Sequence, residues 1–473
     1  MIEVTKYQNK RVSVYGLGKT GAAAIRSLIA GGAQVIAWDD DPIKRANWLN
    51  NIISENIIQN FDKILTDLSS ENWKKIDILL LTPGIPLEYP EPHPIVKFAN
   101  SINCPIISDV ELLYQTCFDC KYIGITGTNG KSTTTSLIGH IFKQNSYKCE
   151  IGGNIGIPVL ELEPLSNDAA YILEVSSYQL DMLKEVRFNT AILLNITPDH
   201  LEYHNNIENY TKAKMKIFAN HQEGDSIIIS IDNDITFKVF NEIKESTDAV
   251  IIPISTDQII KGGVTVIEND LYDFTDLNKS EPVIYKIDNT KNLAGKHNKE
   301  NIAAAYAACL NYIQDPNSII SGINSFRGLA HRMEFLGEIN NMRFINDSKA
   351  TNADAAEKAL LTYDNIYWII GGLSKEGGIS DLKKYFTKIK HAFLIGQAQD
   401  EFAKTLDGSV QFTKSGNLEQ AFKDAVSLAE KDNNTANILL SPACASWDQW
   451  QSFEARGEGF RKLFTEYKEK AFR

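Results

Sequence analysis

The chain has 473 residues, of which 43% are hydrophobic and 23% charged. This composition is typical of globular proteins and excludes a disordered chain, a fibrous repeat and a small disulfide scaffold. At roughly 150 residues per domain, the length predicts about three domains. The net charge of −12 argues against binding to a nucleic-acid backbone, which requires a positive surface. The negative net charge is still compatible with a local pocket for a small anion.

The cysteines and the apolar runs indicate the compartment. Cys117 and Cys120 form the one C-x-x-C pair, and a zinc ribbon would need a second, so reduced thiols are predicted. The first residues lack the apolar core of a signal peptide. No apolar run approaches the roughly 18 residues typical of a membrane span. We therefore expect a cytoplasmic protein with no membrane segment.

Strands and helices alternate from the first residues onward. The first predicted domain, 1–112, has apolar runs typical of strands at 11–15, 34–38 and 76–81 and a helical pattern at 20–30. Strand–helix–strand order indicates a parallel α/β sheet. This domain is predicted to be Rossmann-like.

Two further domains are predicted after residue 112. The central domain, 113–327, has expected strands at 122–125, 171–175 and 190–195, helices at 131–144 and 299–312, and hairpins within 225–290. The last domain, 328–473, has expected strands at 342–346, 366–370, 392–395 and 437–440 and a C-terminal helix over 452–473. We predict a three-domain α/β protein, with a mostly parallel central P-loop ATPase-type domain and a Rossmann-like C-terminal domain.

A glycine motif follows the first predicted strand. Gly16, Gly18 and Gly21 fit G-x-G-x-x-G, which lets the backbone turn tightly and approach a phosphate at a helix N-terminus. Asp39 ends the next strand, where an acid that binds ribose would lie. The motif predicts a nucleotide-like ligand, most directly NAD. A tight turn without a ligand is the alternative.

A second glycine-rich loop runs from Gly124 to Thr133. In a phosphate loop, backbone N–H groups surround the phosphates, Lys131 reaches the terminal ones and Ser132 holds Mg²⁺. The common spacing would place glycine at 125, which is isoleucine here. Because the loop lies between a strand and a helix, we predict ATP binding.

Polar residues follow the next strands of the central domain. Glu174 interrupts an apolar strand, where a carboxylate is costly to bury unless it is paired or bound to a metal. Coordination of Mg²⁺ and satisfaction by backbone amides are both open. Asp199 and His200 could face the same phosphates. His200 and His204 have the spacing of a zinc pair but lack a third ligand. The lysines at 212–216 are typical of a solvated helix face.

The last domain carries polar clusters after its predicted strands. They lie at 346–352, 371–375 and 441–446, and ligands bind at such strand ends in parallel sheets. Arg332, beside a glycine-containing turn, is a candidate contact for phosphate or adenine. A surface arginine is the alternative.

Taken together, these motifs resemble one family, the Mur ligases. Gly-Thr-Asn-Gly-Lys-Ser-Thr, Glu-Val-Ser-Ser-Tyr-Gln-Leu, Asp-His and the lysine helix occur in the order of that family. Its members are ATP-dependent amide ligases of peptidoglycan precursor synthesis, and folylpolyglutamate synthetases are their relatives. The family uses the unusual phosphate-loop spacing. The stretches 346–352 and 440–449 resemble the members that add D-glutamate, and the Asp-Asn-Pro-Arg motif of the diaminopimelate-adding members is absent.

The resemblance implies a role for each matching residue. Catalytic roles are implied for Lys131, His200 and Lys214. ATP contacts are implied for Gly127, Thr128, Asn129, Gly130, Lys131, Ser132, Thr133, Asn298, Asn301, Arg332 and Asp347. Two Mg²⁺ sites are implied, with ligands among Ser132, Glu174, His200 and Lys214, the last as a carbamate. The UDP-linked substrate is expected at Gly18, Lys19, Thr20, Asp39, Thr82, Pro83, Gly84 and Asn154. D-Glutamate is expected at Thr351, Lys375, Ser446 and Phe453.

The resemblance also changes the ligand expected in the first domain, which holds UDP rather than NAD in this family. Lys19 stands at a loop position that is often apolar in relatives, and Asp39-Asp40-Asp41 stands where some relatives carry arginine. The implied reaction joins D-glutamate to UDP-N-acetylmuramoyl-L-alanine through an acyl phosphate, forming ADP and phosphate. We expect a monomer that binds these small molecules and neither nucleic acid nor membrane. The alternatives are another Mur-type or folylpolyglutamate-type amide ligase, a nicotinamide-dependent oxidoreductase, and a P-loop module that hydrolyses ATP to move a partner.

Overall fold

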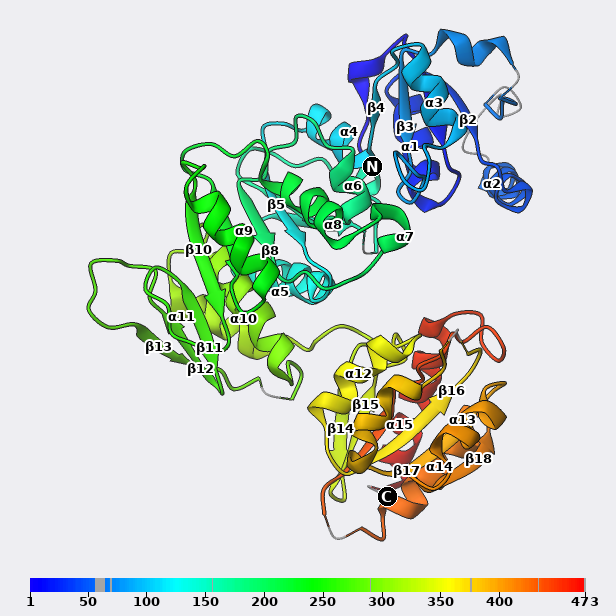
Figure 1. The fold of residues 1–473 in the computed structure, drawn as a ribbon, viewed down its shortest axis with the longest axis vertical. Coiled ribbons are helices and arrows are strands. Elements are labelled where there is room, and N and C mark those ends of the chain that lie inside the picture. The colour runs from blue at the N-terminus through cyan, green and yellow to red at the C-terminus, as the bar shows by residue number, and fades with distance from the viewer. Residues whose placement is uncertain are drawn as a thin grey trace. The chain divides into compact units, whose positions relative to one another are not determined.

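The computed structural model describes residues 1–55, 64–68, 70–154, 156–289, 291–374, 377–432 and 434–471, with only the backbone of 52–55. The chain divides into two compact units. The first unit comprises Met1–Ile287 and Glu300–Ile323, and the second comprises Asp288–Lys299 and Asn324–Arg473. Each unit is built on parallel β-sheet (Figure 1).

The first unit begins with a four-stranded parallel sheet in the order β2-β1-β3-β4. Its strands are β1 (Arg11–Tyr15), β2 (Gln34–Trp38), β3 (Ile78–Leu81) and β4 (Ile106–Ile107). Its helices are α1 (Lys19–Ala30), α2 (Pro42–Glu55), α3 (Pro94–Ser101) and α4 (Asp109–Thr116), with short 3₁₀ turns at Thr5–Tyr7 and Glu71–Lys75. Every residue of β3 is buried, as expected of a strand covered on both faces.

A nine-stranded sheet follows, in the order β13-β12-β11-β10-β9-β8-β5-β7-β6. Its strands are β5 (Lys121–Thr126), β6 (Cys149–Gly153), β7 (Ala170–Glu174), β8 (Thr190–Leu193), β9 (Ser226–Ser230), β10 (Val250–Ser255), β11 (Val264–Ile267), β12 (Asp270–Asp273) and β13 (Val283–Lys286). Along the sheet, each neighbouring pair in the series β6-β7-β5-β8-β9-β10-β11 is parallel. The pairs β11–β12 and β12–β13 are antiparallel and form the expected hairpins.

Several helices accompany this sheet. They are α5 (Lys131–Gln144), α6 (Ser177–Asp181), α7 (Leu201–His204), α8 (Ile207–Met215), α9 (Asp234–Lys244), α10 (Lys296–Cys309) and α11 (Pro316–Ser325), with 3₁₀ turns at Val159–Glu161 and Lys216–Phe218. Parallel pairing places the carboxyl ends of β5, β7 and β8 at one edge. The loops that follow these three strands therefore meet there.

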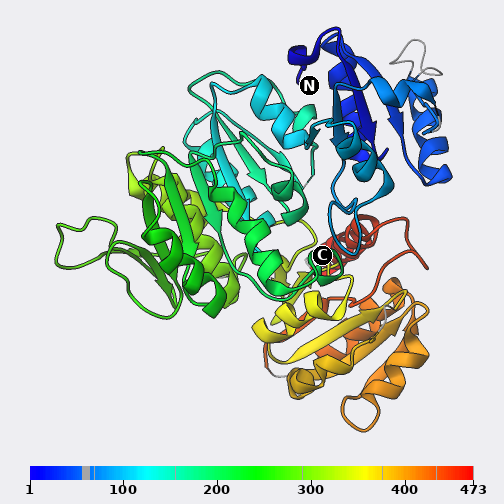
Figure 2. The same cartoon turned by 45° about the horizontal axis from the view of Figure 1, so that its top comes forward.

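The second unit contains a six-stranded sheet in the order β14-β15-β19-β16-β17-β18, in which only the β14–β15 pair is antiparallel (Figure 2, yellow to red). Its strands are β14 (Glu334–Ile339), β15 (Met342–Asn346), β16 (Ile366–Gly371), β17 (Ile389–Ile395), β18 (Phe412–Gly416) and β19 (Ala436–Leu440). Its helices are α12 (Ala353–Thr362), α13 (Gln399–Leu406), α14 (Leu418–Ala429) and α15 (Phe453–Ala471), with a 3₁₀ segment at Ser380–Lys388. Neighbouring residues such as Trp368 and Ile369 belong to separate apolar clusters, so both faces of the sheet are covered.

The predicted fold class is confirmed, and each predicted strand is present within a few residues. The helix expected at 299–312 lies at Lys296–Cys309, three residues earlier. The helix expected at 131–144 has those bounds, whereas α2 and β6 were not predicted. The domain limits at 112/113 and 327/328 stay predictions.

Candidate functional site

The phosphate loop, residues Gly127–Thr133, connects β5 to α5. Gly127 and Gly130 have φ of +151° and +85°, which L side chains rarely adopt. A Cβ at Gly130 would also collide with Asn301 Oδ1. Asn195, which follows β8, holds the loop, because its backbone oxygen accepts from Thr128 N (2.8 Å) and its side-chain oxygen from Asn129 N (2.8 Å). Gly130, the residue before α5, makes no side-chain capping bond, so the first-turn N–H groups face the loop as an anion site.

Two lysines converge on this loop. Lys131 Nζ donates to the backbone oxygens of Gly127 and Thr128, each at 2.8 Å. Lys214 Nζ, from α8, donates to the same Gly127 oxygen at 2.9 Å and lies 4.5 Å from the ring centre of Tyr210. Burial, and then the neighbouring charge of Lys131, hold the pKa of Lys214 well below its ordinary value. Lys214 is therefore a buried amine biased toward its neutral form, unlike the solvated lysine of a basic helix face.

Glu174 ends β7 beside the loop. Its Oε2 accepts from Ser132 Oγ at 2.7 Å, and its Oε1 accepts from Asn154 Nδ2 at 2.9 Å. The structure thus brings together Ser132, Glu174 and Asn154, which the sequence assigned separately to metal and substrate. Hydroxyl and carboxylate oxygens are the donors that Mg²⁺ prefers, so this set fits the cation. The backbone-satisfied alternative for Glu174 does not describe it, because both partners are side chains.

His200 and His204 lie on the segment after β8. His200 adopts a left-handed conformation (φ +53°), is 41% exposed at its side chain, and lies 5.1 Å from the Tyr178 ring. His204 is buried, and its Nε2 lies 2.9 Å from Ser177 Oγ. Among the described residues no group of three or more His, Cys, Asp and Glu side chains could hold a metal ion. The third ligand that a zinc pair would need is therefore missing, and the role of His200 stays a prediction.

The N-terminal glycine loop, residues Gly16–Gly21, forms one wall of a cavity. A Cβ at Gly21 would collide with the backbone oxygen of Gly16, so the turn requires glycine. The cavity measures about 370 Å³, and its lining residues are Gly18, Lys19, Thr20, Asp39, Lys44, Thr82, Pro83, Gly153, Asn154, Gly156, Pro158 and Gln179. Seven of the eight predicted substrate residues belong to this lining, and Gly84 does not. Lys44 and Gln179 were missed, because α2 was not predicted and Gln179 was seen only as part of a motif.

The three acids after β2 have separate structural roles. Asp39 accepts from Leu17 N (2.8 Å) and Asp41 N (2.9 Å), so it fixes the N-terminal glycine loop. Asp40 accepts from Tyr15 OH at 2.5 Å, and Asp41 accepts from Ile43 N at the start of α2. Lys19 and Lys44 line the cavity and bring positive charge to it.

In the second unit, Arg332 lies on a loop with an unusual backbone. Its neighbours His331 and Met333 have φ of +61° and +43°. Asp347 holds this loop by accepting from Met333 N at 3.1 Å and also accepts from Ser441 Oγ at 2.7 Å. Burial raises the pKa of Asp347 to about 7. Arg332 and Asp347, both predicted ATP contacts, therefore belong to one connected loop pair.

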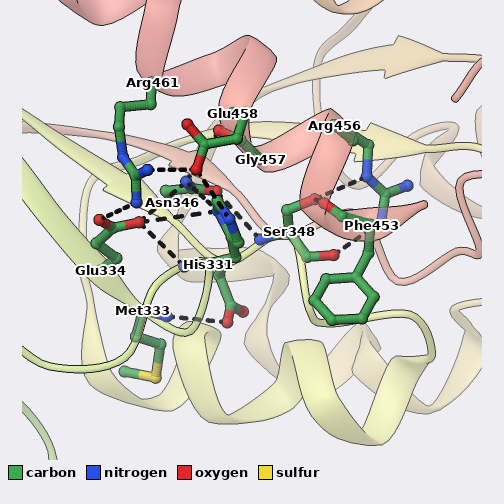
Figure 3. A network of polar contacts seen from close by, with 11 residues as sticks. His331, Met333, Glu334, Asn346, Ser348, Phe453, Arg456, Gly457, Glu458 and Arg461 are labelled. Atoms are coloured by element: carbon green, nitrogen blue, oxygen red, sulfur yellow. Dashed lines mark hydrogen bonds and ion pairs between the residues drawn. The ribbon is translucent and has the colours of Figure 1, made fainter. Parts of the chain in front are cut away.

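A polar network fixes the same loop from α15 (Figure 3). His331 Nδ1 lies 3.0 Å from Asn346 Nδ2, and His331 N donates to Glu334 Oε2 at 3.0 Å. Arg461 joins Glu334 to Glu458 by two ion pairs (Figure 3). Asn346 belongs to the polar cluster at 346–352 that the sequence indicated, whereas Glu458 and Arg461 belong to none of the motifs taken from the sequence.

An arginine that the sequence did not single out joins the segments predicted to bind the amino acid. Arg456 is 1% exposed and donates to Ser348 O (2.8 Å), Ser348 Oγ (3.0 Å) and Cys444 O (3.1 Å). Ser348 Oγ in turn donates to Phe453 O at 2.8 Å. These bonds connect the segments of Thr351, Ser446 and Phe453. Lys375 lies outside the described residues.

The two remaining predicted ATP contacts lie on α10. Asn298, in the second unit, donates from Nδ2 to Ala294 O at 2.7 Å. Asn301, in the first unit, accepts from Thr134 Oγ1 at 3.1 Å and so touches the helix that follows the phosphate loop.

Two family models match the chain. The Mur ligase middle domain matches residues 125–309, and the Mur ligase glutamate ligase domain matches residues 331–444. Among solved structures, MurC (UDP-N-acetylmuramate-alanine ligase) from Thermotoga maritima superposes with a TM-score of 0.55 at 17% identity, covering 97% of this chain and 99% of that one. A pseudomurein peptide ligase type C from Methanothermus fervidus gives 0.54 at 20% identity, covering 97% and 100%. These likenesses show the fold.

Curated relatives are much closer in sequence. The UDP-N-acetylmuramoylalanine–D-glutamate ligase of Caulobacter vibrioides (strain NA1000 / CB15N) is 43% identical over 469 residues, covering 98% of this chain and 97% of the relative. The ligase of the same name from Wolbachia pipientis wMel is 40% identical over 514 residues, covering 98% of each. No helix in the described ranges is long and apolar enough to cross a membrane. The chain therefore belongs to the Mur ligase family, in the group of its UDP-N-acetylmuramoylalanine–D-glutamate ligases.

Proposed function

We propose that this chain joins D-glutamate to UDP-N-acetylmuramoyl-L-alanine, using ATP and forming ADP and phosphate, in the synthesis of peptidoglycan precursors. One contact supports this most directly. Asn154 lines the cavity beside the N-terminal glycine loop and also donates to Glu174, which accepts from Ser132 of the phosphate loop. A UDP-linked substrate in that cavity would thus end beside the ATP site.

The reaction follows from the chemistry of a carboxylate. The L-alanine carboxylate of the substrate attacks the γ-phosphorus of ATP, which gives an acyl phosphate and releases ADP. The amine of D-glutamate then attacks the acyl carbon, loses a proton, and displaces phosphate as the amide forms. When ATP binds, Lys131 Nζ would donate to phosphate oxygens in place of the backbone oxygens of Gly127 and Thr128. The N-terminus of α5 would stabilise the negative charge of the same phosphates.

The cation and the modified lysine are part of the proposal. The family uses ATP and Mg²⁺, and we propose two Mg²⁺ sites held by Ser132, Glu174, His200 and Lys214. Bound Mg²⁺ supplies charge neutralisation for the phosphates. The neutral amine of Lys214 would add to CO₂ and release a proton, which gives a carbamate whose oxygens suit a hard cation. The burial of Lys214 and its lowered pKa support this modification.

We assign the remaining contacts by the same proposal. ATP would meet Asn298, Asn301, Arg332 and Asp347, and D-glutamate would meet Thr351, Lys375, Ser446 and Phe453. The enzyme would act as a monomer on small molecules in the cytoplasm. Its six free cysteines are compatible with a reducing compartment.

Phosphate release tests the proposal. Purified protein is given ATP, Mg²⁺ and UDP-N-acetylmuramoyl-L-alanine, and then D-glutamate, L-glutamate, L-lysine or diaminopimelate in turn. We expect release only with D-glutamate, together with a product whose mass shows one added glutamate. Phosphate release with another amino acid would support the ligase chemistry but overturn D-glutamate as the amino acid added. Release without any amino acid would indicate a simple ATPase.

A further inference from the structure

His204 follows the proposed metal ligand His200 by four residues and is not itself one of the proposed ligands. It ends α7 at 5% exposure, with Nε2 2.9 Å from Ser177 Oγ and Nδ1 3.7 Å from Asp181 Oδ2. Burial lowers the pKa of His204, which favours the neutral ring. The Asp181 carboxylate opposite Nδ1 favours a proton on that nitrogen, which leaves Nε2 able to accept the hydroxyl proton of Ser177.

The partners of His204 are the first and last residues of α6. This helix follows Glu174 after two residues. Asp181 accepts from Lys216 Nζ at Oδ1 (2.9 Å) and at its backbone oxygen (3.2 Å). Lys216 comes two residues after Lys214. Helix α6 therefore connects three segments, which carry Glu174, His200 and Lys214.

Aromatic packing makes this connection rigid. The Tyr178 ring on α6 lies 4.4 Å from Tyr203 and 5.8 Å from His204, measured between ring centres. His204 lies 5.2 Å from Tyr210, whose hydroxyl is 3.3 Å from Thr128 Oγ1 in the phosphate loop. The cluster thus extends from α6 to the loop that faces ATP.

We infer that His204 is a positioning residue that, through Ser177 and Asp181, holds the segments of Glu174, His200 and Lys214 in the arrangement that binds the divalent cation. This inference rests on the proposed function. The Ser–His–Asp order resembles a nucleophilic triad, but Ser177 is only 2% exposed and presents no hydroxyl to a substrate. Groups that orient metal ligands typically change metal affinity by about 10- to 100-fold when removed.

The test measures cation binding directly, with Mn²⁺ as the probe. Free Mn²⁺ is followed by electron paramagnetic resonance in solutions of protein, ADP and bicarbonate. We expect His204→Leu to weaken Mn²⁺ binding by about tenfold or more. His204→Gln should restore most of the affinity, because its amide oxygen can accept the Ser177 proton. The matched control is His391→Leu, which removes a histidine–hydroxyl contact of equal length (Nε2 to Thr413 Oγ1, 2.9 Å) from β17 of the second unit.

The outcomes separate the two claims. Equal Mn²⁺ affinity in folded His204→Leu and His391→Leu would overturn the positioning role. If His204→Leu does not fold, Ser177→Ala carries the same expectation, because it removes one hydroxyl. Wild-type protein that lacks D-glutamate-dependent phosphate release, but shows the Mn²⁺ difference, would overturn the proposed function and keep the positioning role. No Mn²⁺ binding by the wild type would overturn both.

Discussion

The first unit contains two glycine-rich loops with the same outline. Each follows a buried parallel strand and precedes a helix, and each contains a glycine that cannot bear a Cβ, Gly21 in one and Gly130 in the other. Neither α1 nor α5 has a side-chain cap at its N-terminus. Both loops therefore present backbone N–H groups to an anion.

The loops differ in how a neighbouring acid is used. Asp39 accepts from two backbone N–H groups, of Leu17 and Asp41, which hold their places as long as the fold is intact. Glu174 accepts from two side chains, Ser132 and Asn154, which can rotate away. Asp39 is thus a fixed part of its loop, whereas Glu174 can exchange its partners for a cation. Glycine spacing indicates an anion site in both loops, and the donors around the acid distinguish the loop with the proposed metal site.

The largest expected effect comes from exchanging the lysine of each loop. By the proposed function, Lys131→Met removes a charge that would contact the transferred phosphate, so kcat should fall by about 10²- to 10³-fold. Lys19→Met removes a charge from the cavity wall, so the KM for the UDP-linked substrate should rise by about tenfold with kcat unchanged. Steady-state phosphate release measures both. A large loss of kcat in Lys19→Met would contradict the view that the N-terminal glycine loop only binds substrate while the phosphate loop takes part in the reaction.

A smaller effect is expected from the two acids. Glu174→Gln keeps the shape but weakens cation binding, so the Mg²⁺ concentration for half-maximal activity should rise by about 10- to 100-fold. Asp39→Asn should leave that Mg²⁺ dependence unchanged and lower the melting temperature, because one backbone N–H loses a charged acceptor. Mg²⁺ titrations and thermal unfolding of both variants provide the measurement. An altered Mg²⁺ dependence in Asp39→Asn would mean that both acids serve the cation.

The sequence predicted the strands and both loops well, for physical reasons. Buried parallel strands are continuous apolar runs, and β3 and β16 are of this kind. Glycines at positive φ mark loops directly. Helix α2 (Pro42–Glu55) was not predicted from the sequence.

The site was predicted less completely, because contacts between distant segments leave no local pattern. Arg456 stands in an ordinary charged helix, yet it is buried and joins Ser348 to Cys444. Lys44 and Gln179 line the cavity beside the N-terminal glycine loop from elements that the sequence did not connect with it. The spacing of His204 from His200 is that of a zinc pair, and the sequence does not show that its partners are Ser177 and Asp181.

The smallest expected effect concerns a third acid, Asp109, the first residue of α4. Its side-chain partner is Gln179 Nε2 at 3.4 Å, and burial raises its pKa to about 6, above the ordinary 3.8. The folded state binds the Asp109 proton more tightly than the unfolded state, and below about pH 3.8 this stabilisation is fully present. The stabilisation is lost as the pH rises through about 6. The Asp109→Asn variant has no carboxyl group to titrate at this position. Between pH 4.5 and 7, its melting temperature should therefore decrease by a few degrees less than the melting temperature of the wild type. Thermal unfolding across that range, followed by circular dichroism, measures the difference. Parallel curves would show that the folded state does not bind the Asp109 proton more tightly than the unfolded state, and would contradict the raised pKa.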